Sequence, residues 1–141
     1  MIKTLQFTVL GEPRGKARHR TTRSGFTYTP KETIEYENLV RLSFQEAYPE
    51  HIPLDCEVDV IIEAYYSIPT TFSKKKRCLA LDNVINPTKK PDVDNIAKSI
   101  LDSLNKIAFI DDKQVTSCTI YKMYAEKPRV EVQISYQKEE I

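Results

Sequence analysis

The sequence predicts an α+β fold in which a small mixed β-sheet of about four strands packs with two main helices. Four stretches alternate apolar and polar residues, as half-buried strands do, and two longer stretches repeat apolar residues at helical spacing. The 141 residues, 40% of them hydrophobic, suffice for one domain with a core that needs no disulfide or structural metal. We therefore expect a single domain over residues 1–141.

The strand predictions rest on alternation between apolar and polar side chains. This pattern occurs in residues 2–10, from Val58 to Tyr66, and in residues 115–124 and 129–136. Only a short segment separates the last two stretches, so we expect them to pair as a closing hairpin.

The first main helix is expected over about residues 30–48. Thr29 is suited to the N-cap, Pro30 to the first turn, and Glu32 would complete a capping box. Pro49 interrupts the helical pattern.

The second main helix is expected from Asp94, a suitable N-cap, to about Lys106. Its apolar residues form one stripe and its charged residues lie opposite. Ser73 is suited to cap a shorter, basic helix over residues 74–80.

The net charge is only +1, but the charges are segregated along the chain. Residues 11–25 hold five basic residues against one acid, together with all three glycines. Residues 92–112 hold five aspartates against two lysines. A flexible basic loop and an acidic cluster are therefore expected within one nearly neutral chain.

Several classes of protein are disfavoured. Three cysteines without a CxxC pair argue against a disulfide framework and a zinc site. No apolar run is long enough to cross a bilayer, and no signal sequence opens the chain, so we expect a cytoplasmic protein without a membrane partner. The glycine-rich loop lacks the spacing of a Walker motif, which argues against a nucleotide cofactor.

Two pairs of aspartates carry the chemical prediction. Asp92 and Asp94 stand where an extended segment enters the second helix, and Asp111 and Asp112 follow that helix. The apolar run of residues 107–110 is expected to fold back along the helix and bring the pairs together. Clustered carboxylates raise one another's pKa, and Mg²⁺, or Mn²⁺ in its place, would relieve this repulsion. Such an ion activates water for phosphodiester hydrolysis.

Lys98 lies one helical turn after Asp94, where it could neutralise charge on a phosphate. Each acid has a simpler alternative role: Asp94 as a helix cap, and Asp111 with Asp112 as a solvated turn. Asp102, like Asp111, is expected to be a solvated residue or an outer partner of the metal site. Their combination within 21 residues favours a functional site.

A nucleic acid is the expected partner of the basic residues. Phosphate contacts need cations on an accessible surface and read no bases. The expected DNA-binding residues are Arg14, Lys16, Arg18, Arg20, Lys75, Lys76 and Lys90. The alternative, that they form only a solvated basic face, stays open, most of all for residues 74–77.

These motifs resemble the RusA family of Holliday junction resolvases. The similarity runs through Gly11-x-Pro13-x-x-Lys16-x-Arg18, Tyr28-x-Pro30, Lys90-Pro-Asp-Val-Asp-Asn-Ile-x-Lys98, Leu101-Asp-Ser-Leu-Asn105 and Asp111-Asp-x-Gln-Val115. The resemblance implies a homodimeric, Mg²⁺-dependent crossover junction endodeoxyribonuclease with a RusA-like domain. It implies symmetric paired nicks in four-way junctions, and a role in phage or prophage DNA recombination and repair.

By motif position, the resemblance implies that Asp92, Asp94 and Asp112 are catalytic metal ligands and that Lys98 is the catalytic lysine. Two alternatives stay open. The chain could be a non-catalytic protein that binds branched DNA, or a metal nuclease acting on flap DNA or RNA.

Overall fold

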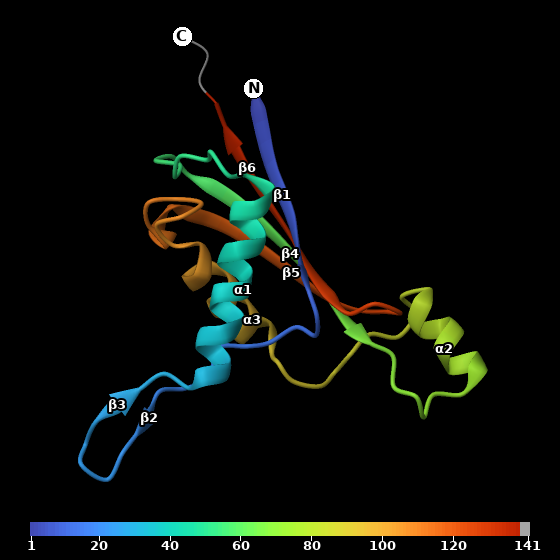
Figure 1. Cartoon of the computed structure of the whole chain (residues 1–141). Helices are drawn as coiled ribbons and strands as arrows, with labels where there is room; N and C mark the ends of the chain where they lie inside the picture. Colours follow the sequence, from blue (N-terminus) through green and yellow to red (C-terminus); the bar gives the residue numbers. More distant parts are fainter. Residues whose placement is uncertain (139–141) are drawn as a thin grey trace.

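A four-stranded mixed sheet forms the centre of the fold in the computed structural model, which describes residues 1–138 (Figure 1). Its strands are β1 (Ile2–Leu10), β4 (Val58–Ser67), β5 (Val115–Ala125) and β6 (Arg129–Gln137), in the order β1-β6-β4-β5. β5 runs parallel to β4, and the other neighbours are antiparallel. The α+β class and the four-stranded mixed sheet are confirmed.

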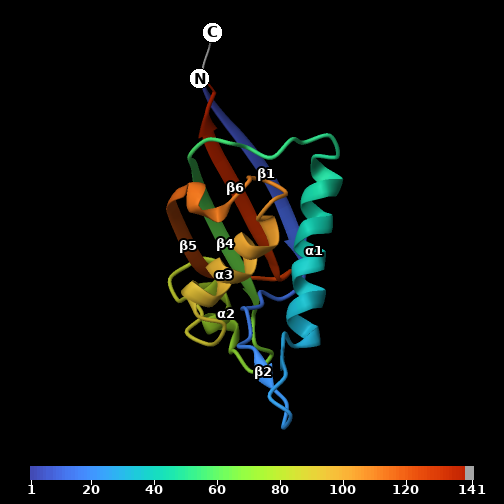
Figure 2. The ribbon, with the colours of Figure 1, turned by 90° about the vertical axis from the view of Figure 1, so that its left-hand side faces the viewer.

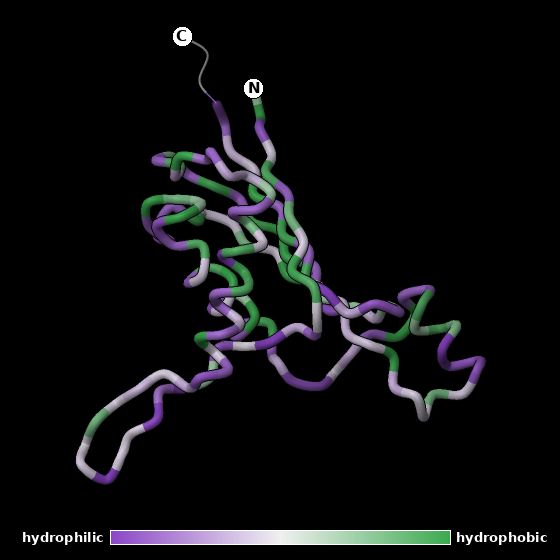
Figure 3. Tube along the Cα trace, in the orientation of Figure 1, coloured by the Kyte–Doolittle hydropathy of each residue, from purple (hydrophilic) through white to green (hydrophobic). Residues whose placement is uncertain are grey.

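Two helices cover one face of this sheet, α1 (Lys31–Ala47) and α3 (Val93–Leu104) (Figures 1 and 2). The inward residues of the strands and the apolar stripe of α3 form one buried core. In α3 these are Ile96, Ile100 and Leu104, each at most 1% exposed. Figure 3 shows hydrophobic residues gathered in this layer and hydrophilic ones along the loop that leads into α3.

Three smaller elements extend from this body. The strands β2 (Arg20–Thr21) and β3 (Thr27–Tyr28) form a hairpin within the basic loop, and α2 (Lys74–Leu81) follows β4. The 3-10 helix η1 (Asp112–Gln114) precedes β5. The predicted cap of α2 is confirmed, because the Ser73 hydroxyl accepts a hydrogen bond from the Lys76 N–H at 3.1 Å.

The predicted hairpin of the last two strands is wrong, because β4 lies between β5 and β6. The inward residues of β4 are almost fully buried, so this strand takes a central position with a neighbour on each side. β5 carries exposed polar residues over residues 116–119, which suits the edge of a sheet.

The predicted caps of the two main helices are also corrected. Pro30, not Thr29, is the N-cap of α1, and no side chain caps it. The Thr33 hydroxyl instead accepts a hydrogen bond from the N–H of Ala17 in the basic loop. α3 begins one residue before Asp94, with Asp92 as its N-cap.

No helix in residues 1–138 combines the length and the apolar character that crossing a bilayer requires.

Candidate active site

The segment that enters α3 is tied to the sheet. The Tyr66 hydroxyl donates a hydrogen bond to the Pro91 carbonyl at 2.9 Å, and the Lys122 ammonium donates to the Lys89 carbonyl. Burial, and next the negative charge of Asp92, raise the pKa of Tyr66, so this phenol stays a neutral donor. The position of Asp92 is therefore fixed by its neighbours on the chain.

The basic loop lies directly against this end of α3. A Cβ atom on Gly15 would stand 2.9 Å from the Cβ atoms of both Asn95 and Pro91, so only glycine fits here without a shift. The N–H of Lys16 donates to the Asn95 carbonyl at 3.2 Å. The fold thus places the two most charged segments of the sequence side by side.

The carboxylates at this end are not used by the fold. Asp92 and Asp94 are exposed, and Asp92 makes no side-chain hydrogen bond as N-cap. Neither acid forms an ion pair with any of residues 1–138, and the same holds for the exposed Lys98. All three charges are free to meet a ligand.

At the other end of α3 the two acids have different surroundings. The Asp111 carboxylate accepts the Lys113 N–H, and the Gln114 side chain accepts the Asp111 N–H, both at 2.9 Å. This capping box starts η1, and the Lys113 N–H lowers the pKa of Asp111. Asp111 therefore has a structural role.

Asp112 is the acid left free at that end. Its N–H donates to the Asn105 side-chain oxygen at 3.1 Å, which holds it beside the last turn of α3. Desolvation, and next the neighbouring Asp111, raise the pKa of its carboxyl. A carboxylate in such surroundings gains from a cation.

The predicted convergence of the acids does not occur within one chain. Asn105, beside Asp112, follows Asp94 by eleven residues, which is about 16 Å along a helix. Residues 108–109 are buried in the core. The turn that contains them lies at the C-terminal end of α3 and does not return along the helix to Asp94. Within the described residues, no three acidic, histidine or cysteine side chains meet as a metal site. The three aspartates of one chain therefore do not fit one ion, and their role as ligands stays a prediction.

Asp102 was predicted to be a solvated residue or an outer partner of the metal site, and Lys16 to contact DNA. In the structure the two side chains form an ion pair with each other. The Lys16 ammonium lies 2.5 Å from the Asp102 carboxylate and 3.9 Å from that of Glu37. The hydrogen bond that the Lys16 ammonium donates to Asp102 raises the pKa of Lys16. The pair connects the basic loop to both helices. Sequence reasoning missed Glu37, whose position beside the apolar stripe of α1 could have indicated its burial.

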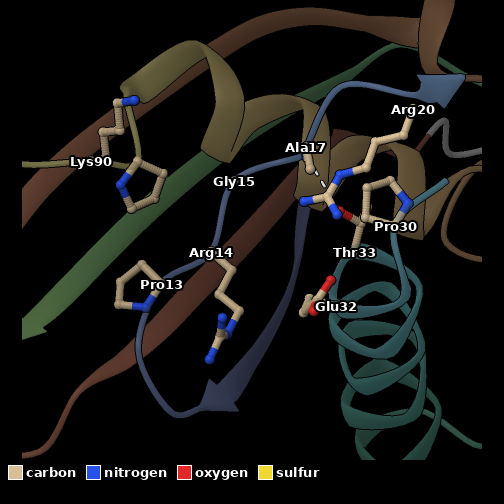
Figure 4. Close-up of a pocket in the computed structure, with 10 residues that line it drawn as sticks. Pro13, Arg14, Gly15, Ala17, Arg20, Pro30, Glu32, Thr33 and Lys90 are labelled. Carbon is tan, nitrogen blue, oxygen red and sulfur yellow. Dashed lines mark hydrogen bonds between the residues drawn. The ribbon is translucent and has the colours of Figure 1, made fainter.

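Other cations surround an open pocket of about 400 Å³ (Figure 4). Arg14, Arg20 and Lys90 line it together with Glu32, an acid that the sequence analysis assigned only to the capping box of the first helix. Arg18 is exposed in the loop just before the β2–β3 hairpin. In Figure 1 this hairpin and α2, which carries the exposed Lys75 and Lys76, flank the loop that leads into α3.

The sequence of this chain is similar to those of known proteins. The family model described as endodeoxyribonuclease RusA matches residues 10–135. The uncharacterized protein YqaN of Bacillus subtilis (strain 168) is 36% identical over 135 residues, which cover 92% of this chain and 94% of that protein.

Proposed function

This chain belongs to the RusA family of endodeoxyribonucleases, and on that premise we propose that it resolves Holliday junctions in DNA recombination and repair. We propose that it acts as a homodimer and makes paired symmetric nicks, one for each subunit. The observation that carries this proposal is the pair of exposed, unengaged carboxylates, Asp92 and Asp94, directly beside a basic loop.

The proposed cofactor is Mg²⁺, with Mn²⁺ as an alternative. Asp92 and Asp94 supply oxygen ligands at the start of α3, and Asp112 is the third proposed ligand. A bound divalent ion would activate water and stabilise negative charge on a phosphate. Lys98, exposed and without an ion pair in residues 1–138, is proposed to neutralise phosphate charge in the same site.

The proposed DNA surface consists of two basic areas on either side of this site. Arg14, Arg18, Arg20 and Lys90 form the area near the hairpin, and Lys75 and Lys76 form the area on α2. Each exposed cation that meets a phosphate releases counterions, so junction binding should weaken steeply as salt rises. Lys16 is placed differently, since Asp102 and Glu37 already neutralise its ammonium.

The test is cleavage of a labelled four-way junction with and without Mg²⁺. We expect metal-dependent paired nicks, and we expect Asp92→Asn to abolish them while junction binding is retained or becomes tighter. Glu46→Gln, which removes an exposed acid from the far end of α1, is the matched control and should cleave as the unaltered protein does.

Competing substrates decide between the alternatives. Preference for flap DNA or RNA over the junction would replace the proposed substrate. Junction binding without cleavage under any divalent metal would leave a non-catalytic DNA-binding protein.

A further inference from the structure

We propose that the β2–β3 hairpin is a base-stacking arm. Phe26 stacks on a DNA base whose face is open at the branch point, and the arginines of the hairpin hold the adjoining phosphates. The inference rests on the proposed function for its partner, a four-way junction. It supplies a physical reason for binding a branched DNA in preference to a duplex.

The first step is an aromatic side chain that the core does not use. Phe26 is 72% exposed and Tyr28 is 44% exposed. Every residue from 18 to 28 is exposed, and in Figures 1 and 2 the hairpin projects away from the sheet beyond the start of α1. Covering apolar surface is favourable, so this ring stabilises a complex with any partner that packs on it.

The second step is that local hydrogen bonds hold Phe26 in position. The Gly25 N–H donates to the Thr22 carbonyl at 3.0 Å and closes a turn in which Gly25 has a φ of +85°, a conformation that favours glycine. The Thr22 N–H donates to the Phe26 carbonyl at 2.8 Å, and the Phe26 N–H donates to the Thr22 hydroxyl at 3.1 Å. The tip thus presents Phe26 to the solvent with its backbone already ordered.

The third step is the grouping of aromatic and basic side chains on the hairpin. Phe26 and Tyr28 are two residues apart, and the hydrogen bond from Thr22 to Phe26 extends the strand pairing by one step, so both rings lie on the same face. Arg20 pairs directly with Tyr28 and shares this face. One face of the hairpin therefore offers two rings and a guanidinium group.

The fourth step is the charge of the arm. Residues 18–28 contain three arginines and no acid. Arg18, Arg20 and Arg23 form no ion pair with any of residues 1–138, so their charges are available to a polyanion. Cations for the phosphates beside aromatic rings for the bases are the combination with which proteins bind unpaired DNA strands.

The fifth step is the choice of the branch point. Inside a duplex both faces of each base are already stacked, and a ring that enters has to separate them. At a branch point the strands change partners, so a base face is opened at lower cost. The arm also starts beside the proposed active site, because Arg20 lines the same pocket as Lys90, two residues before Asp92. The arm and the site can therefore contact one branch point together.

The first experiment compares the binding of a four-way junction with that of a linear duplex of the same sequence, in EDTA so that no strand is cut. Phe26→Ala should weaken junction binding by at least about fivefold, the lower value for loss of stacking on one base, and change duplex binding little. Phe26→Trp keeps an aromatic ring and should retain the preference. Ile52→Ala is the matched control, since it removes a side chain that is 80% exposed, in the loop after the other end of α1.

The second experiment detects stacking directly. The chain contains no tryptophan, so Phe26→Trp introduces a single one. Stacking on a base quenches indole fluorescence, and we expect the junction to quench it strongly and the duplex to have little effect. Ile52→Trp places the same reporter away from the arm and should respond to neither DNA.

Arg23→Gln separates phosphate contacts from stacking. It should weaken the binding of junction and duplex alike and lower the slope of the salt dependence by about 1.

The inference requires both a selective loss of junction binding in Phe26→Ala and quenching of Phe26→Trp by the junction. Equal losses for junction and duplex would place the ring in a groove of the duplex, and any other combination of results would overturn the inference as well. Both measurements are made without cleavage. A protein that meets both requirements and cuts no junction in Mg²⁺ would contradict the proposed function alone, whereas one that cuts junctions and fails either requirement would contradict this inference alone.

Discussion

The two ends of α3 carry the same residue type for different purposes. At the first end, Asp92 and Asp94 use none of their carboxylate oxygens to hold the fold together. At the other end, Asp111 closes a capping box, and its neighbour Asp112 stays free. The number of acids is therefore a poor guide to function. The structural aspartate is the one whose carboxylate accepts a hydrogen bond from a backbone N–H. The aspartates without such a bond are available to a ligand.

The largest expected effect comes from Asp112→Asn. Mutation of a residue that only contacts a metal ligand lowers metal affinity or activity by up to about 100-fold. Loss of Asp112, a proposed ligand itself, should therefore lower junction cleavage by more than this. Stability should be unchanged or slightly higher, because desolvation and, next, the neighbouring Asp111 already disfavour the charge at this position. Single-turnover cleavage and thermal melting of the same preparation measure both. Full activity in this variant would remove Asp112 from the site.

A smaller effect, on stability, is expected from Lys16→Met near the first end. This change leaves Asp102 and the buried Glu37 without their shared cation. A hydrogen bond to a charged group contributes about 1.5–3 kcal/mol, and partial exposure places this pair near the lower value. Urea unfolding measures the loss.

Lys31→Met is the matched control for that change, since it removes an exposed lysine paired with Glu35 one turn along α1. Such pairs contribute about 0.3–0.5 kcal/mol. Equal losses in the two variants would mean that Lys16 does not tie the loop to the helices.

The structural role of Asp111 predicts a loss of stability in Asp111→Ala, because the change removes a side-chain cap. Because the Asp111 carboxylate accepts the Lys113 N–H at the start of η1, its loss should loosen the turn that carries Asp112. Hydrogen exchange at Lys113, whose N–H loses its acceptor, reports this directly. Unchanged protection at Lys113 would contradict the assigned role.

The smallest effect concerns Tyr36, which lies buried below the basic loop. Its hydroxyl has no hydrogen-bond partner in residues 1–138, so Tyr36→Phe should gain up to about 1 kcal/mol near neutral pH. Burial raises the pKa of Tyr36 to about 12, against a usual value of 10.0. The folded state therefore holds this proton more tightly, and the resulting stability is lost as the pH rises from 10 towards 12.

Tyr36→Phe should lose less stability over that interval than the unaltered protein, because phenylalanine has no proton to release. Urea unfolding at pH 9 and pH 11 compares the two. Parallel losses would assign the alkaline sensitivity to other groups.

Local patterns in the sequence were sufficient for much of the fold. Alternation identified all four strands of the sheet, and helical spacing identified α1 and α3 within a residue or two of their ends. The motifs between Gly11 and Val115 were enough to identify the family, since they depend on residue identity and spacing alone. These properties reside in short segments, so they can be recognised without knowing how the segments pack.

Only the tertiary structure decided which distant segments meet. The chain order of β5 and β6 suggested a hairpin, but burial of β4 separated them. No local pattern joins Lys16 to Asp102, which lie 86 residues apart. The same holds for the acids at the two ends of α3: their spacing suggested one cluster, and the rigid length of the helix keeps them apart. Contacts between remote residues depend on how whole elements pack, and that is a property of the complete chain.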